Sequence, residues 1–475
     1  MRSPRTVVAA ALSALAVLPG ALSGQKVDSA FKGSVLERLA ARRDSTFHYA
    51  AYIPKGYTGD RPVPLLLVLD PLGRAVPSLE LTIRAAERLG WVVMSSYDTR
   101  GDVANAPNEK AVNLMLDDAF QTFRVDTSRL YLAGFSGLAR DTWVFAYGAG
   151  GHVAGIISAS AAMPGDTAWR HRYGGKPPYD AALTAGSHDF NYDEVFNTVD
   201  TLRTLGAGVR ADAFDGAHQW PPEPVMAQVM GWLDARAMAR GLAPMDSTLV
   251  DSLFGVDSMR AEAAVDSARA GEATLRWENA AAAWRGLHDV TSARAADAAL
   301  LADPRVARWR AEHDSLQRAT VGVQQVMSAT LTGIRQHPGV PDLRKLSDAL
   351  HIAQFEEWAA DRQDSVRASW ADRRLSDLYV QVSFYEPEAY LGVADPTRAL
   401  SMLAVAEMIR PKAKGLCRER ARAYALRRDA DLTITKLKCA LAAHEMTLAE
   451  VRADPRYQFM RTLDAFIDLI TPPGG

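Results

Sequence analysis

The chain has 475 residues, with 54 basic and 56 acidic side chains, a formal net charge of −2 and 48% hydrophobic residues. A near-neutral chain without a Lys/Arg tract excludes nucleic-acid binding of the usual basic kind and steering of ligands by a strong overall field. Cysteine occurs only twice, which excludes a cysteine-rich zinc site. A chain of this length is expected to hold two or three domains.

The N-terminal segment predicts export. Residues 1–23 begin with Arg2 and Arg5, continue without a charge from 6 to 18, and end in small residues. An apolar run this short behind a basic start is typical of a secretory signal peptide, and a membrane anchor is the alternative. We therefore expect an exported protein, periplasmic or extracellular, whose mature part begins near residue 24 and has no membrane span.

Residues 24–243 alternate short apolar runs with helical stretches. Strands are expected at 47–53, 64–69, 91–95, 129–135, 155–158, 181–185 and 209–214, and helices at 79–89, 110–123, 138–147, 191–205 and after 221. The run at 64–69 is apolar throughout, as in a strand buried on both faces. Strands separated by helices of this length predict an α/β fold with a doubly wound, mostly parallel sheet.

Beyond residue 243 glycine becomes sparse and the pattern is helical to the end. Residues 244–394 form a helical region of unassigned type, and 395–475 resemble tetratricopeptide-repeat hairpins. A 34-residue frame gives small and large residues the spacing of that repeat at Ala399, Leu403, Ala406, Pro411, Ala421, Tyr424, Leu437 and Ala440. An unrelated helical hairpin is the alternative. A repeat of this kind would offer a surface to a protein partner.

The two cysteines are a candidate disulfide. In the 34-residue frame Cys417 lies near the start of one helix and Cys439 near the end of its antiparallel partner, with small residues around them. A tight hairpin can supply the required separation of about 4.4–6.8 Å between Cα atoms. Two independently buried thiols are the alternative.

Ser136 lies in the most informative stretch of the chain. A predicted strand at 129–135 runs into Gly134-Phe-Ser136-Gly137, and a predicted helix follows. Such a strand–turn–helix exposes the serine oxygen above the sheet edge, next to a helix N-terminus, as in a nucleophile elbow. The pattern departs from Gly-x-Ser-x-Gly at Leu138. One hypothesis is that the bulk of this leucine displaces the elbow helix or covers part of the pocket.

A serine nucleophile needs a base and an orienting acid. Asp189 follows the predicted strand at 181–185, and His218 follows the last predicted strand. This is the chain order Ser, acid, His, and both side chains would emerge at the carboxyl edge of the sheet. Asp193 and Asp215 are rival acids. We prefer Asp189 because Asp193 lies a helical turn further on and Asp215 is close to His218 in sequence.

Residues 45–240 resemble the α/β-hydrolase superfamily, specifically secreted esterases of the dienelactone-hydrolase, feruloyl-esterase and polyhydroxybutyrate-depolymerase type. The resemblance is carried by the elbow Gly134 to Arg140, except Leu138, by the acid loop Asp189-Phe-Asn-Tyr192 and by the histidine loop Gly216-Ala-His218-Gln-Trp220-Pro221. It covers under half of the chain. It implies a serine esterase with Ser136, His218 and Asp189 as its catalytic residues. We expect no cofactor and no metal.

The oxyanion site is a second departure from these esterases. Its expected donors are the N–H of Gly137 and one N–H from the loop after the strand ending at Leu69. Relatives often carry His-Gly in that loop, whereas this chain has Asp70-Pro71-Leu72-Gly73. Proline has no N–H, so Leu72 is the expected second donor.

The segment at 161–180 is too short for a cap domain, so we expect the serine to open onto a shallow face. An open face suits large or polymer-attached esters, or peptides. The expected function is therefore an exported serine hydrolase, a carboxylic ester hydrolase. A serine peptidase on the same fold is one alternative. The other is a non-catalytic hydrolase-like domain coupled to a helical interaction module, which Leu138 and Pro71 favour.

Overall fold

The computed structural model describes residues 28–103, 106–149, 151–164, 176–266, 269–361 and 365–471. The expected signal peptide at 1–23 lies outside these residues. The chain divides into two compact units, Met1–Arg310 and Ala311–Gly475. None of the helices in the described ranges has the length and apolar character needed to cross a membrane.

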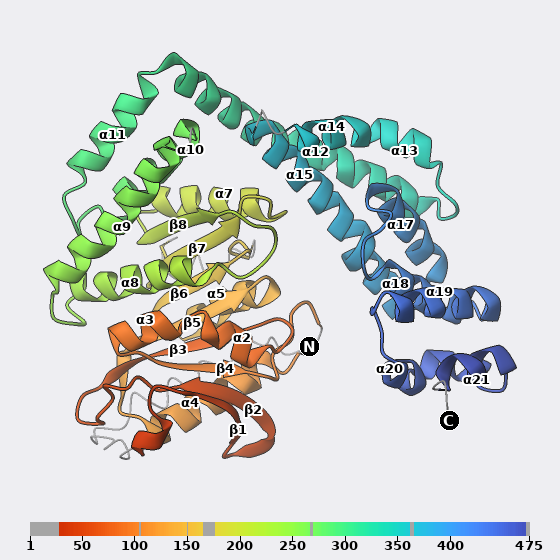
Figure 1. The fold of residues 1–475 in the computed structure, drawn as a ribbon, viewed down its shortest axis with the longest axis horizontal. Coiled ribbons are helices and arrows are strands. Elements are labelled where there is room, and N and C mark those ends of the chain that lie inside the picture. Colours follow the sequence, from red (N-terminus) through yellow and green to blue (C-terminus); the bar gives the residue numbers. More distant parts are fainter. Residues whose placement is uncertain are drawn as a thin grey trace. The chain divides into compact units, whose positions relative to one another are not determined.

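The described part of the first unit is built on an eight-stranded sheet with the order β1-β2-β4-β3-β5-β6-β7-β8 (Figure 1). The strands are β1 (Val35–Ala41), β2 (Asp44–Tyr52), β3 (Val63–Leu69), β4 (Val92–Ser96), β5 (Val125–Phe135), β6 (Val153–Ala159), β7 (Asp180–Gly186) and β8 (Val209–Phe214). β2 runs antiparallel to both β1 and β4, and the other neighbours are parallel. The predicted fold class, a mostly parallel α/β sheet followed by a helical region, is confirmed.

Helices cover both faces of this sheet. They are α2 (Ala75–Glu80), α3 (Ile83–Leu89), α4 (Asn108–Thr122), α5 (Gly137–Gly148), α7 (Tyr192–Thr204) and α8 (Glu223–Ala239), and a 3-10 turn, η3 (Ser29–Phe31), precedes β1. Apolar side chains of α4, α5 and α7 pack on one face of the sheet, and those of α2, α3 and α8 pack on the other. Burial on both faces explains why β3 reads as a continuous apolar run, and β4, β6 and β7 are also buried along their whole length.

The registers of the parallel strands place the loops of the candidate site next to one another. Leu69 of β3 is level with Gly134 of β5, Phe135 of β5 with Ala159 of β6, and Gly186 of β7 with the last residue of β8. Parallel strands that end at the same level release their following loops at one edge of the sheet. The loops that carry the predicted site residues therefore begin side by side.

The first unit extends past residue 243. It also contains α9 (Ser247–Asp266), α10 (Ala270–Ala283) and α11 (Thr291–Leu301). Side chains of these helices, including Leu253 and Trp277, and Trp284 directly after α10 belong to the same buried cluster as α8 and one face of the sheet. The change in sequence composition near residue 243 thus follows the end of α8 and does not mark the end of the packed unit.

The second unit is helical throughout its described residues. Its elements are α12 (Pro304–Gln336), which begins before residue 311, α13 (Leu343–Ala349), α14 (Ile352–Ala360), α15 (Ser365–Val380), the π-helical turn η4 (Gln381–Tyr385), α16 (Glu386–Gly392), α17 (Pro396–Ile409), α18 (Leu416–Leu426), α19 (Ala430–Ala442), α20 (Leu448–Ala453), the 3-10 turn η5 (Pro455–Met460) and α21 (Asp464–Ile470). Its core contains the aromatic side chains of Phe355 and Trp370.

The repeat frame falls on three of these helices. Ala399, Leu403 and Ala406 are buried on α17, Ala421 on α18, and Leu437 and Ala440 on α19. Small buried residues let neighbouring helices approach closely, as the frame requires. That these hairpins are tetratricopeptide repeats stays a prediction. Cys417 of α18 and Cys439 of α19 form a disulfide in the structure, with Cα atoms 5.8 Å apart.

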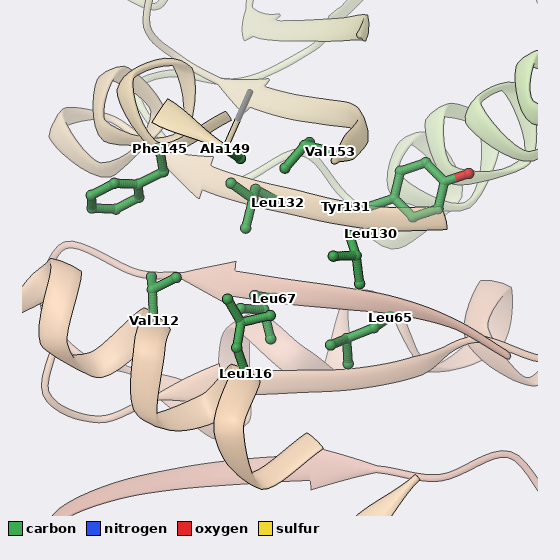
Figure 2. Close-up of a pocket in the computed structure, with 10 residues that line it drawn as sticks. All are labelled: Leu65, Leu67, Val112, Leu116, Leu130, Tyr131, Leu132, Phe145, Ala149 and Val153. Carbon is green, nitrogen blue, oxygen red and sulfur yellow. The ribbon is translucent and has the colours of Figure 1, made fainter. Parts of the chain in front are cut away.

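A cavity of about 20 Å³ lies in the core of the first unit, between β3, β5 and α4 (Figure 2). Its lining is apolar, as Leu65, Leu67, Leu132 and Phe145 illustrate, and the hydroxyl of Tyr131 points away from it. A space of this size holds about one water at most. It is a packing gap and not a substrate pocket.

Candidate active site

Ser136 occupies the turn between β5 and α5. Its backbone angles, φ 55° and ψ −126°, lie in a region that L-residues avoid, and its N–H donates to the carbonyl of Ala159 at 2.9 Å. Gly134 is required beside it, because a Cβ there would lie 2.3 Å from the carbonyl oxygen of Leu138. The strained turn and the close approach of helix to strand are those of a nucleophile elbow.

The three predicted side chains meet at the sheet edge. The Nε2 of His218 lies 2.9 Å from Oγ of Ser136, and its Nδ1 lies 2.9 Å from Oδ1 of Asp189. They come from the loops after β8, β5 and β7. Because Nδ1–H donates to a carboxylate, the Nε2 lone pair is left to face the serine hydroxyl.

Asp189 is the acid bonded to the imidazole, as we preferred over Asp193 and Asp215. Its side chain is fully buried, and its Oδ1 also accepts the N–H of Asn191 at 2.9 Å. The amide of Asn191 in turn donates to the carbonyl of Ser160 at 2.8 Å, which ties this loop to the end of β6. A buried carboxylate held in this way keeps the imidazole in one orientation.

Two aromatic rings fix the plane of the imidazole. Phe190 stacks on His218 with ring centroids 4.3 Å apart, and Phe135 lies at 4.8 Å. Phe135 immediately precedes the serine, and Phe190 immediately follows the acid. Neither ring was predicted from the sequence, where their positions directly beside Ser136 and Asp189 could have indicated them.

The structure contradicts one predicted oxyanion donor. Gly137 is the first residue of α5, where N–H groups have no acceptor within the helix, so its N–H suits the role. The N–H of Leu72, however, donates to Oδ1 of Asp70 at 2.8 Å. The cause is local: an aspartate side chain readily accepts the N–H two residues on. Leu72 is therefore not a free donor in this structure.

Asp70 is the residue that sequence reasoning missed. Its carboxylate is fully buried and also accepts from the guanidinium of Arg74 at 2.8 Å and from the indole N–H of Trp220 at 2.8 Å. Its own carbonyl accepts the hydroxyl of Thr99 at 2.9 Å. Asp70 thus joins the loops that follow β3, β4 and β8, and the last of these carries His218. Its position directly after a buried strand could have indicated this role, because such a residue lies at the edge where the loops meet.

Leu138 does not obstruct the elbow. Its side chain is fully buried in the core. Space for it comes from Gly101, since a Cβ on that glycine would lie 3.3 Å from Cδ2 of Leu138 and 2.7 Å from Cβ of Pro71. The side chain therefore does not cover the pocket, whereas a displacement of the elbow helix by this leucine stays a prediction. A glycine on the neighbouring loop accommodates the larger residue.

Two further predictions about the surroundings of the site were an open face without a cap domain and the lack of a metal. Residues 165–175 of the short segment at 161–180 lie outside the described residues, so the absence of a cap stays a prediction. Within the described ranges, no group of three or more His, Cys, Asp or Glu side chains is placed to hold a metal ion.

No protein-family model and no curated protein matches this chain. Solved structures do resemble it. The substrate-bound fluorophosphonate-binding serine hydrolase F of Staphylococcus aureus is 14% identical, with a TM-score of 0.36, over 42% of this chain and 97% of its own. A hyperthermophilic esterase from the archaeon Pyrobaculum calidifontis is 17% identical, with a TM-score of 0.35, over 43% and 87%.

A third structure, the S954A mutant of the feruloyl esterase module from Clostridium thermocellum, complexed with sinapinate, is 13% identical, with a TM-score of 0.33, over 45% of this chain and 90% of its own. TM-scores of this size carry no inference about activity, which must come from the geometry of the site.

Proposed function

We propose that this protein is a serine hydrolase that cleaves carboxylic esters, with Ser136 as nucleophile, His218 as general base and acid, and Asp189 as the orienting carboxylate. One observation carries the proposal: two hydrogen bonds of 2.9 Å connect a strained, elbow-borne serine through an imidazole to a fully buried carboxylate. A chance contact of three polar residues would not also place the serine next to a helix N-terminus.

The reaction follows from these contacts. Oγ of Ser136 attacks the ester carbonyl while Nε2 of His218 takes its proton, and the carbonyl oxygen becomes an oxyanion facing the N–H of Gly137. The imidazolium, stabilised by Asp189, then protonates the leaving alkoxide, and an acyl-enzyme remains. Water, activated by the same imidazole, cleaves the acyl-enzyme and restores the serine.

One observation favours a second candidate, a hydrolase-like binding protein without turnover. The N–H of Leu72 is engaged by Asp70, so the loop after β3 lacks the free donor expected there. The loss of one oxyanion donor typically costs about 10²–10³ in kcat. A site weakened this far could still bind or react once with an acylating compound.

The finer parts of the proposal rest on the sequence alone. We propose export on the basis of residues 1–23, and a protein partner for the hairpins at 395–475 on the basis of their repeat frame. A serine peptidase remains the nearer alternative activity, because the same three groups can cleave an amide.

The proposal is tested with a fluorophosphonate probe and with p-nitrophenyl acetate. Wild-type protein is expected to be labelled on the peptide that carries Ser136 and to release p-nitrophenol with multiple turnovers. Ser136→Ala should lose both properties, whereas Ser258→Ala on α9 should retain them. Labelling with less than one turnover per molecule would favour the binding protein. Absence of labelling in the folded wild type would reject the nucleophile.

A further inference from the structure

Asp102 lies against the residue that follows the nucleophile. A Cβ on Gly137 would be 3.0 Å from Oδ1 of Asp102 and 3.2 Å from its backbone nitrogen. Asp102 belongs to the loop after β4 and has φ 54°, a conformation that aspartate and asparagine tolerate better than most residues. The loop therefore presents a carboxylate at the start of α5, beside the proposed oxyanion donor.

The carboxylate of Asp102 has no partner in the described part of the chain. It is exposed, and neither a hydrogen bond nor an ion pair joins it to another described residue. Its charge nevertheless acts on α5. Burial raises the pKa of Asp141, the Asn108 amide opposes this effect with a 2.8 Å hydrogen bond, and the charge of Asp102 raises the pKa further.

Three arginines on neighbouring described segments bond to groups other than Asp102. The guanidinium of Arg74 pairs with Asp70, and that of Arg140 pairs with Glu194. Arg100 lies against the loop after β3, where its Nη1 donates to the carbonyls of Tyr97 at 2.8 Å and Thr99 at 2.6 Å. Asp102 is thus a carboxylate without an ion-pair partner among the described residues, and it lies next to Gly137, whose N–H is the proposed oxyanion donor.

We propose that Asp102 determines specificity by selecting substrates that carry an ammonium or guanidinium group close to the scissile ester bond. The inference rests on the proposed hydrolase function and adds the substrate class to it. A fixed negative charge beside Gly137 opposes the developing oxyanion of a neutral ester. A cation on the substrate attracts the carboxylate and offsets this repulsion, so cationic esters gain over neutral ones.

The rival explanation is structural. A carboxylate near the N-terminus of α5 stabilises that helix through its dipole, with no role toward substrate. In that case the removal of the charge would lower the melting temperature and change neutral and cationic esters by the same factor. A comparison of esters that differ only in charge separates the two explanations.

Two isosteric pairs make the comparison. Acetylthiocholine and S-(3,3-dimethylbutyl) thioacetate place the charge in the leaving group. The p-nitrophenyl esters of 4-(trimethylammonio)butanoate and 5,5-dimethylhexanoate place it in the acyl group. The readout is the ratio of kcat/KM, cationic over neutral, for wild type and for Asp102→Asn. Asparagine keeps the shape and tolerates the same backbone angles.

For at least one pair the wild-type ratio is expected to exceed one and to fall roughly three- to tenfold in Asp102→Asn, with the neutral ester gaining and the cationic ester losing. High salt should lower the wild-type ratio in the same direction. Glu37→Gln is the matched control, since Glu37 is exposed on β1, which β2, β4 and β3 separate from β5. It should leave both ratios unchanged.

The outcomes are distinct. Ratios that Asp102→Asn leaves unchanged for both pairs, or that stay at or below one in the wild type, overturn the inference while the hydrolase function stands. A folded wild type that cleaves none of the four esters and resists fluorophosphonate overturns the proposed function itself.

Discussion

The two units differ in what their interiors bury. Aspartates are buried repeatedly in the first unit, among them Asp70, Asp189 and Asp257, whereas Glu419 is the buried carboxylate among the described residues of the second unit. A buried carboxylate is costly unless it is paired or hydrogen bonded. Two of the three named aspartates hold loops of the candidate site, and the third holds a helix to the sheet. Among its described residues the second unit buries fewer carboxylates: Glu419 pairs with Arg418 and Arg422, Arg374 is fully buried, and apolar helix contacts and a disulfide supply the rest of its packing.

The comparison teaches where chemistry is to be expected. Buried polar groups with several partners fix the geometry of an edge where loops meet, and this is the edge at which Ser136 and His218 lie. Apolar helix packing fixes shape without placing reactive groups. The predictions below test this division, from the largest expected effect to the smallest.

The largest effect is expected for the base. His218→Ala should lower kcat by roughly 10⁴–10⁶, because His218 is the base that contacts Oγ of Ser136 among the described residues. Asp189→Asn should lower kcat by roughly 10⁴ through loss of the imidazole orientation. Asp193→Asn is the matched control and should be mild. Ester turnover and thermal melts of the three variants check this. A severe Asp193→Asn with a mild Asp189→Asn would move the acid, and an active His218→Ala would reject the base.

The strands from β2 to β8 could be predicted because they are short runs rich in apolar residues, whereas the single helix expected at 79–89 is two helices, α2 and α3. The proximity of Ser136, Asp189 and His218 could be predicted because parallel strands release their loops at one edge, so chain order implies proximity. β1 was not predicted, since Val35-Leu-Glu-Arg-Leu-Ala-Ala41 lacks the alternation of a strand and is defined by its pairing with β2.

The features that the sequence did not reveal depend on contacts between distant segments. Whether Leu138 fits is decided by Gly101 on another loop, and whether the N–H of Leu72 is free is decided by the rotamer of Asp70. The end of the first unit is decided by helices that pack back onto the sheet after residue 243. None of these can be read from local periodicity.

The second prediction concerns the helices that extend the first unit past residue 243. Arg210 of β8 is buried and bonds Asp257 of α9 at 2.6 Å and Asp212 at 2.6 Å, and Trp284 also donates to Asp257 at 2.6 Å. Arg210→Met should lower the free energy of unfolding of the first unit by about 3–5 kcal/mol, because it leaves a buried carboxylate without its cation. Denaturant unfolding checks this. Arg43→Met is the control: it removes the exposed ion pair of Arg43 with Asp117 and should lower the free energy of unfolding by at most about 1 kcal/mol.

The same cluster has a pH signature. Burial raises the pKa of Asp257, but the charge and hydrogen bonds of Arg210 outweigh burial and hold the net pKa below its usual value. The contribution of the Arg210–Asp257 pair to the free energy of unfolding is therefore complete above the unfolded-state pKa of Asp257. It is lost as pH falls through the folded-state pKa. A loss in Arg210→Met no larger than that in Arg43→Met would mean that α9 is not held to the sheet by this cluster.

The third prediction concerns the elbow. Leu138→Ala should cost about 2–5 kcal/mol of stability, because it empties a fully buried position. Leu138→Gly should cost about 1 kcal/mol more through helix propensity. Neither variant should gain kcat/KM toward esters, since the leucine lies in the core. Thermal melts and ester kinetics check both. A gain in kcat/KM for Leu138→Gly would restore the hypothesis that this side chain impairs the site.

The last prediction addresses the second unit. Cys417 and Cys439 close a segment with a sequence separation of 22, for which chain entropy gives a stabilisation of about 3 kcal/mol. The double variant Cys417→Ser, Cys439→Ser should lower the stability of the second unit by about this amount and leave ester turnover unchanged, because the candidate site lies in the first unit. Wild-type protein treated with a thiol reductant is the matched control and should reproduce the loss. Unfolding followed by hydrogen exchange in the two units separates them: a stability loss confined to the first unit, or a parallel loss of turnover, would contradict the division of roles between a chemical unit and a packing unit.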